Sequence, residues 1–369
     1  MRILLDSLIL CTKRGGKKGG TQPCEIHIDC GAQIAKGVLA MGHDQWGLPD
    51  LKAVIKAPTM EPRSGRLIDN ECYDAETGLL LICPNFDEWP GVPEQPSHED
   101  VRKAFDVLWQ PFAQFSFTGP VSVGVFIAAL LTAIIRPALR TAPGFLITSP
   151  MPGSGKSLLS DCLSLLAGQI PSKVHPVSDS QEEIKKLLLA LGRSGCPAVI
   201  FDNIENCFRS SAMCAWLTTE MYSDRLLQKS KEATVPTRIL VILNGNNALL
   251  AGDICRRVLT CQIDPQTEEP WRHRFDLDPR QHCTDNRLSM VAAGLTILRA
   301  GMQMGKQSLD RTASFEDWSD IVRPAIALIS ELGIMDVEDP VESIQEAFRQ
   351  DPGREDLRLV LETWFDVFA

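Results

Sequence analysis

The sequence predicts an α/β fold in which helices flank a parallel sheet, with a small β-rich or winged element before it and a helical domain after it. Three observations support this prediction. A glycine-rich turn joins an apolar strand to an amphipathic helix in residues 144–166, two later apolar strands near 197–202 and 239–243 end in polar side chains, and helical periodicity continues after Ile263. The expected domains are 1–95, 96–264 and 265–369.

The composition is typical of a soluble globular protein with room for more than one domain. The chain has 369 residues, of which 44% are hydrophobic and 23% are charged, and its net charge is -10. This charge gives no sign of a broad nucleic-acid-coating surface, although a few local lysines suffice for a narrow channel. The longest apolar run, 121–135, is too short to span a bilayer. We recognise no secretory signal, and twelve cysteines without a C-x-x-C pair suit a reducing cytosol, so a cytoplasmic location is expected.

The first 95 residues are expected to form an N-terminal region that ends in a linker. The stretch 13–20 mixes basic residues with glycines, which is typical of an exposed loop and less often of a clamp on a phosphate backbone. Cys24, His27 and Cys30 have a spacing that could hold zinc, but a strand gives the same alternation. Four prolines within 84–96 mark the linker.

Two helices are expected before the glycine-rich turn. Ser97 followed by Asp100 is a capping signal for a helix over about 99–115. The apolar run that starts at Val121 predicts a second, buried helix to about residue 139. Because these helices lead directly into the turn, we expect them to pack on the flank of the sheet domain.

The turn itself has the order strand, loop, helix that a phosphate site needs. The N–H groups of such a loop point inward, and the helix N-terminus adds its positive end. The residues expected to bind the nucleotide are Gly153, Ser154, Gly155, Lys156 and Ser157. Lys156 would reach the outer phosphates and Ser157 would hold Mg²⁺. Pro150 stands where the pattern G-x-x-x-x-G-K-[ST] has its first glycine, and a fortuitous glycine-rich turn is the alternative.

The strand P-A-V-I-F-D ends in Asp202, which would face the same crevice as the glycine loop. Asp202 could hold Mg²⁺ or its water, or it could simply cap the next turn. Asn203 follows it and cannot accept a proton from water. Glu205 is a candidate base if the turn brings it back toward the site.

The second strand, 239–243, ends in L-N-G-N-N, where Asn244 or Asn246 could hydrogen-bond the γ-phosphate or the attacking water. Arg256 and Arg257 follow. Paired arginines are most often surface residues, but one beside a nucleotide can act as an arginine finger, in cis or across a subunit boundary.

A hairpin is expected between these two strands, carrying Lys229 and Lys231 among small polar residues. It is either a solvated turn or a face where a substrate strand passes. After Ile263 the pattern predicts helices at 288–302, 315–332, 341–348 and 357–368.

Several sequence motifs, taken in their order along the chain, resemble the C-terminal part of phage and prophage primase-helicases, whose motor is of the superfamily 3, AAA+-like P-loop type. The motifs are K-A-P-T-M near 57, Y-D-A-E-T-G-L-L near 75, L-L-T-A-I-I-R-P-A-L-R-T-A-P-G-F near 137, P-G-S-G-K-S, F-D-N-I, L-N-G-N-N, D-I-C-R-R-V, and F-E-D-W with V-R at 322. The resemblance covers about four fifths of the chain, from about residue 54 to 351.

The resemblance implies an ATP-dependent DNA helicase of phage or mobile-element replication, working with Mg²⁺ as a homo-oligomer, a hexamer, around single-stranded DNA. It assigns Lys156 and Ser157 to the phosphate loop, Asp202 and Asn203 to the Mg²⁺ motif, Asn246 to the sensor, Arg256 or Arg257 to the finger, and Lys229 and Lys231 to the DNA-gripping hairpin. Pro150 and Asn203 depart from the pattern. No priming activity is expected.

Two alternatives from other classes remain open. A small-molecule kinase also uses a glycine loop and a lysine, but it would need an acceptor pocket and an arginine-rich lid. A nucleotide-binding assembly protein with little turnover is compatible with Pro150 and Asn203.

Overall fold

The structure is a computed structural model that describes residues 12–14, 25–27, 37, 51–178, 180–225, 232–272, 274–305 and 310–368. The chain divides into two compact units, 1–50 and 51–369. In the first unit, β1 (Thr12–Arg14) pairs antiparallel with β2 (Glu25–His27). His27 therefore lies on a strand, whereas Cys24 and Cys30 lie outside the described residues, so the zinc prediction is not tested.

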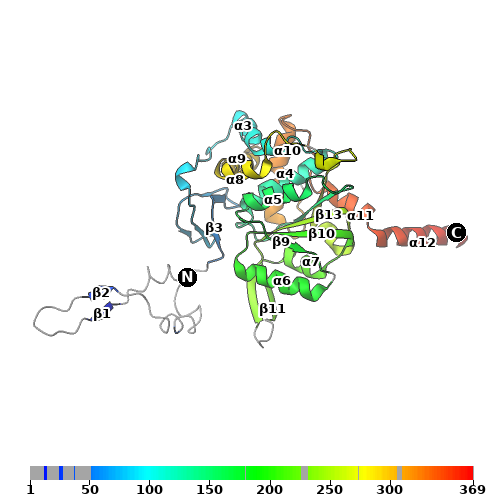
Figure 1. Ribbon diagram of the computed structural model, residues 1–369, viewed down its shortest axis with the longest axis horizontal. Coiled ribbons are helices and arrows are strands. Elements are labelled where there is room, and N and C mark those ends of the chain that lie inside the picture. The colour runs from blue at the N-terminus through cyan, green and yellow to red at the C-terminus, as the bar shows by residue number, and fades with distance from the viewer. Residues whose placement is uncertain are drawn as a thin grey trace, which may run out of the picture. The chain divides into compact units, whose positions relative to one another are not determined.

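The second unit is built on a five-stranded sheet in the order β14-β8-β13-β10-β9 (Figure 1). Its strands are β8 (Gly144–Ser149), β9 (Val174–Pro176), β10 (Ala198–Phe208), β13 (Leu240–Leu250) and β14 (Val258–Gln262). All four pairings between them are parallel. Every residue of β8 is buried, as expected for a parallel strand covered on both faces. The predicted fold class, a parallel sheet flanked by helices, is confirmed.

Helices cover both faces of this sheet (Figure 1). They are α4 (Pro120–Ile135) and α5 (Lys156–Leu166) on one side, and α6 (Gln181–Ser194) and α7 (Ser211–Thr218) on the other. The apolar run expected to be a buried helix is α4, which is buried along almost its whole length. It ends at Ile135, earlier than predicted, and Arg136 is its C-cap.

The predicted capping signal is present at the start of α3 (His98–Trp109). The Ser97 side chain accepts a hydrogen bond from the Asp100 backbone N–H, and the Asp100 carboxylate accepts one from the Ser97 N–H. These two bonds satisfy helix donors that otherwise lack partners. A short helical turn, η3 (Gln110–Phe112), extends α3 toward the sheet.

The predicted β-rich element consists of short strands at the start of the second unit. They are β3 (Ala53–Ile55), β4 (Thr59–Met60), β5 (Leu67–Ile68), β6 (Tyr73–Asp74) and β7 (Leu79–Leu81), followed by η2 (Phe86–Glu88). Three of them form the sheet β3-β7-β6, and β4 pairs with β5. Ile55, Met60 and Leu79 belong to the same buried cluster as the central sheet.

The segments after β14 are mostly helical, as predicted. They are η5 (Pro270–Arg272), α8 (Pro279–Asp285), α9 (Arg287–Met304), α10 (Glu316–Glu331), α11 (Glu342–Arg349) and α12 (Pro352–Phe368). Helix α9 packs against both α3 and α10. Among the described helices, none combines the length and apolar character needed to cross a membrane. The domain boundaries near 95 and 264 stay predictions.

Candidate functional site

The glycine loop has a backbone that only glycine adopts easily. Gly153 has φ +76° and Gly155 has φ +93°, both in the left-handed region. A Cβ on Gly155 would lie 2.8 Å from Cε1 of Phe115. These two turns bring the chain out of β8 and into α5, whose first residue is Lys156. The strand, loop and helix predicted from the sequence are therefore all present.

Lys156 is buried and folds back onto its own loop. Its Nζ donates to the Met151 carbonyl at 3.1 Å and to Ser154 Oγ at 3.0 Å. Burial lowers the pKa of Lys156, while the negative charge of Asp202 acts in the opposite direction. The strand register places Asp202 near the end of β8, because Phe201 pairs with Leu243 and Leu243 pairs with Leu146, so the lysine and the carboxylate lie at the same edge of the sheet. Ser157 is exposed in the first turn of α5.

The strand that carries Asp202 continues past it, to Phe208, with an extra residue inserted. The pairing of β10 with β13 runs from Phe201 opposite Leu243 to Ile204 opposite Gly245, so β10 contains one residue more than its partner. Asn203 has φ +63° at this point. Such a bulge bends the strand and changes which side chains share a face.

Because of the bulge, Asp202 and Glu205 project from the same face of the sheet. In a regular strand two residues that are three apart face opposite sides. Here Glu205 pairs with Asn246, which pairs with Ser149 at the end of β8. Glu205 is exposed, and its Oε1 accepts a hydrogen bond from Asn203 Nδ2 at 3.4 Å. The turn thus brings Glu205 to the level where the glycine loop begins.

The two asparagines at the end of the apolar part of β13 have different environments. Asn244 is buried, and its Oδ1 accepts a hydrogen bond from Ser160 Oγ on α5 at 2.6 Å. Its Nδ2 is buried and has no hydrogen-bond partner among the described residues. Asn246 is exposed, two residues further along. Both therefore lie on the face of the sheet that α5 covers.

Arg256 and Arg257 lie at the other end of β8 from the glycine loop. Arg256 is the last residue of η4 (Gly252–Arg256) and Arg257 is its C-cap, and the Arg257 carbonyl accepts a hydrogen bond from the N–H of Gly144, the first residue of β8. Both guanidinium groups pair with Asp253. The Arg256 side chain is 57% exposed and that of Arg257 is 14% exposed. A strand of this length separates them from the loop of the same chain by about 16 Å, so this position does not favour a finger in cis.

The predicted hairpin is formed by β11 (Met221–Arg225) and β12 (Glu232–Pro236), which pair antiparallel. Lys229 and Lys231 fall between these strands and lie outside the described residues.

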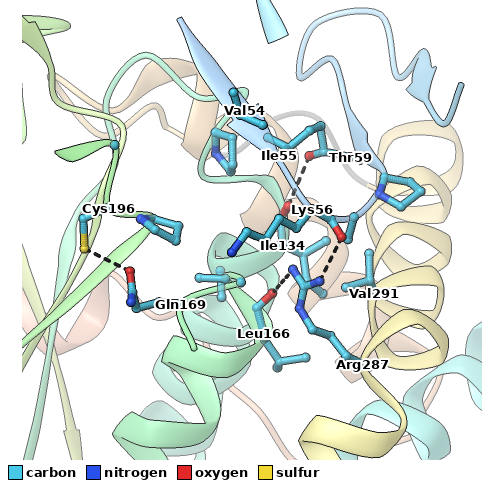
Figure 2. A pocket seen from close by; sticks show the side chains of 18 of the residues that line it. Val54, Ile55, Lys56, Thr59, Ile134, Leu166, Gln169, Cys196, Arg287 and Val291 are labelled. Atoms are coloured by element: carbon cyan, nitrogen blue, oxygen red, sulfur yellow. Dashed lines mark hydrogen bonds between the residues drawn. The ribbon is translucent and has the colours of Figure 1, made fainter. Parts of the chain in front are cut away.

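A cavity of about 320 Å³ is lined by the end of α5 and by residues that directly precede β9 and β10 (Figure 2). It therefore lies at the amino-terminal edge of the sheet, whereas the glycine loop follows the carboxyl end of β8. All the residues that line the cavity belong to the described part of the chain. They include Lys56, Lys173 and Arg287, and none of them is acidic. The Arg287 guanidinium donates to the carbonyls of Leu165 and Leu166 at the end of α5 and to that of Lys56. The Arg287 guanidinium thus lies at the negative end of α5, and Lys173 Nζ donates to Ser194 Oγ at the last residue of α6, so helix C-termini account for two of the three cations.

A segment from the C-terminal region lies over the glycine loop. The Phe275 ring packs on Phe115 with centroids 4.7 Å apart, and Gln114 and Asp276 exchange hydrogen bonds. In the same segment, Trp271 contacts Gly153. Sequence reasoning missed this segment. Its local signal is two aromatic residues, Trp271 and Phe275, in an otherwise polar stretch.

The fold and the loop define the class of this protein. An all-parallel sheet, with a glycine loop leading from an interior strand into a helix and a carboxylate two strands away, is the arrangement of a P-loop NTPase fold.

No protein-family model matches the chain, and no curated protein matches its sequence. Among solved structures it is similar to the apo NrS-1 C-terminal region, at 16% identity and a TM-score of 0.39 over 74% of this chain and 62% of that one. It is also similar to JCV helicase, at 15% identity and a TM-score of 0.27 over 64% of this chain and 61% of that one. A third is SCCmec type IV Cch, an active helicase, at 10% identity and a TM-score of 0.30 over 86% of this chain and 62% of that one. The chain spans less than two thirds of the length of each of these structures.

Proposed function

We propose that this chain is a nucleoside triphosphatase that uses ATP to move along DNA, as an ATP-dependent DNA helicase or translocase. The observation that carries the first half of the proposal is the placement of Lys156, at the end of the glycine loop, and Asp202, two strands away, at the same edge of the parallel sheet, because a triphosphate with a divalent cation requires such a pair. The second half of the proposal, movement on DNA, is supported by the resemblance of the sequence motifs to those of superfamily 3 helicases.

The residues at the loop fit Mg²⁺ as the companion of the nucleotide. Ser157 offers an exposed hydroxyl and Asp202 a half-buried carboxylate, and Mg²⁺ prefers such hard oxygen ligands. When bound, Mg²⁺ would neutralise phosphate charge. The proposal assigns Gly153, Ser154 and Gly155 to the phosphate cradle.

The side chains of this chain divide the remaining work of hydrolysis. Lys156 exchanges its bonds to Met151 and Ser154 for phosphate oxygens, where its charge stabilises the transition state. Glu205 takes a proton from the attacking water in place of Asn203, which cannot. Asn246, or the unpartnered Nδ2 of Asn244, orients the γ-phosphate or the water.

Arg256 or Arg257 would act on the nucleotide of a neighbouring subunit. Arg256 is the more exposed, and both lie away from the loop of their own chain. A finger supplied in trans requires a ring or another head-to-tail assembly. The proposal therefore includes a homo-oligomer, a hexamer by resemblance, with Lys229 and Lys231 reaching single-stranded DNA in its channel.

ATP turnover, measured with and without single-stranded DNA, tests the proposal. We expect the wild-type chain to hydrolyse ATP faster when DNA is present and Lys156→Ala to lose turnover. Lys185→Ala is the matched control, because Lys185 is a lysine of α6 that pairs only with the exposed Glu182 among the described residues. An ATP hydrolysis rate that is the same with and without DNA contradicts the proposed DNA motor. Transfer of phosphate to a metabolite indicates a kinase, and nucleotide binding without turnover indicates an assembly protein.

A further inference from the structure

Trp271 lies directly against the glycine loop. A Cβ on Gly153 would be 3.4 Å from Trp271 Cβ and 3.7 Å from its ring atom Cε3. Residues 271 and 153 are far apart in the chain, so this contact is made by the fold. It places the indole at the outer wall of the loop that we propose binds phosphates.

Trp271 as a residue is 61% exposed, which is unusual for the amino acid with the largest apolar side chain. The residue before it, Pro270, is buried, and Phe275 further along packs on Phe115. The segment is therefore anchored on both sides of Trp271, and its tryptophan still faces outward. An anchored aromatic with an open face, beside a phosphate site, is suited to stack on a planar group.

We propose that Trp271 is the platform on which the purine base of the bound nucleotide stacks. This inference rests on the proposed function, since the phosphates held by the loop bring their base to the neighbourhood of Gly153. Every nucleobase has an apolar π-face, whichever hydrogen-bonding groups it carries on its edge. Stacking can therefore bind the base without a hydrogen bond to any of those groups. The platform thus adds affinity for the nucleoside part of the ligand and none for the phosphates.

The charges around the indole do not compete with this role. Arg272 pairs with Glu269 at 2.9 Å, on the same short turn, which leaves Trp271 flanked by a neutralised pair. Two other aromatic residues near the loop, Phe275 of the same segment and Phe115, pack on each other. Trp271 is therefore the aromatic side chain, among those described at the loop, that offers an open face.

The test compares a ligand that has a base with one that lacks it. Binding of ADP and of inorganic tripolyphosphate, each with Mg²⁺, is measured by calorimetry on the full chain for wild type, Trp271→Ala and Trp271→Phe. The matched control is Trp364→Ala, a tryptophan of α12 that is 55% exposed. Quenching of tryptophan fluorescence by ADP, present in wild type and reduced in Trp271→Phe, provides a direct readout.

We expect Trp271→Ala to weaken ADP binding by about 5- to 150-fold, the range that loss of one base–aromatic stack gives, and to leave tripolyphosphate binding unchanged. Trp271→Phe should lose less, and Trp364→Ala should bind both ligands as wild type does. Unchanged ADP binding in Trp271→Ala overturns the platform, as does an equal loss for both ligands, which would mean that Trp271 only supports the loop. If wild type binds neither ligand, the proposed function fails and this inference fails with it.

Discussion

Replacing Gly155 with alanine tests the geometry of the glycine loop without any ligand. Its φ of +93° costs a non-glycine residue about 1–2 kcal/mol. The new Cβ would also lie 2.8 Å from Cε1 of Phe115, a residue that is 8% exposed and whose ring packs against Phe275. Overpacking of this kind costs about 1–3 kcal/mol. We expect Gly155→Ala to lower the free energy of unfolding by about 2–5 kcal/mol.

Gly195→Ala is the matched control for this prediction. Gly195 follows α6 with φ +63°, and nothing lies within 4 Å of the position its Cβ would take. Alanine there should cost the backbone term alone, about 1–2 kcal/mol. Urea unfolding followed by circular dichroism measures both. The excess loss in Gly155→Ala should shrink when Phe115→Ala is added, because the clash is then gone. Equal losses in the two glycine variants would refute the described contact.

Two further predictions concern buried charges. Burial lowers the pKa of Lys156 below its unfolded value, so between these two pKa values the unfolded chain binds more protons and stability rises with pH. Lys156→Met lacks this dependence, so its stability relative to wild type should fall as the pH is raised from 7 to 10. Urea unfolding measures both stabilities, and a difference that stays constant with pH would contradict a lowered Lys156 pKa as the cause. Asp339→Asn should cost about 3 kcal/mol, because Arg323, with 8% of its side chain exposed, loses the carboxylate that pairs with it at 2.5 Å and keeps the neutral acceptors Ser319 Oγ and the Asp310 carbonyl. Asp320→Asn, at an exposed pair, should cost less than about 1 kcal/mol in the same assay.

The elements that local rules govern were predicted well. The capping box at Ser97, the buried helix α4 and the loop between β8 and α5 each depend on residues close together in sequence. The same holds for the helices after β14. The ends of the strands were harder to predict, because β10 and β13 continue well beyond the apolar runs from which they were predicted.

The parts of the site that depend on long-range packing were not predictable. Nothing near Trp271 in the sequence indicates that it contacts Gly153. The position of Arg257 at the amino-terminal end of β8 follows from the return of the chain between β13 and β14. A sequence pattern gives the order of strands along the chain, whereas these contacts depend on which strands become neighbours in the sheet.

Asn203 departs from the helicase pattern that the sequence resembles, and its backbone conformation also shapes the site. Asparagine enters the left-handed region more readily than most residues, and φ at Asn203 is +63°. The residue is therefore suited to form the bulge that turns Glu205 toward Asp202, although it cannot itself serve as a base. Asn203→Gly should keep the bulge and the turnover of ATP. Asn203→Val disfavours positive φ, so Glu205 would move to the opposite face.

Turnover in Asn203→Val and in Glu205→Gln should then fall by similar factors, about 10²- to 10⁴-fold, the usual contribution of a general base. Binding of ADP with Mg²⁺ should persist in Glu205→Gln, since in the proposed mechanism this carboxylate acts on water and not on the nucleotide. Urea unfolding of each variant separates loss of chemistry from loss of fold. Full turnover in Glu205→Gln, or in a folded Asn203→Val, would show that the bulge does not supply the base, because either result breaks the link between backbone register and proton transfer.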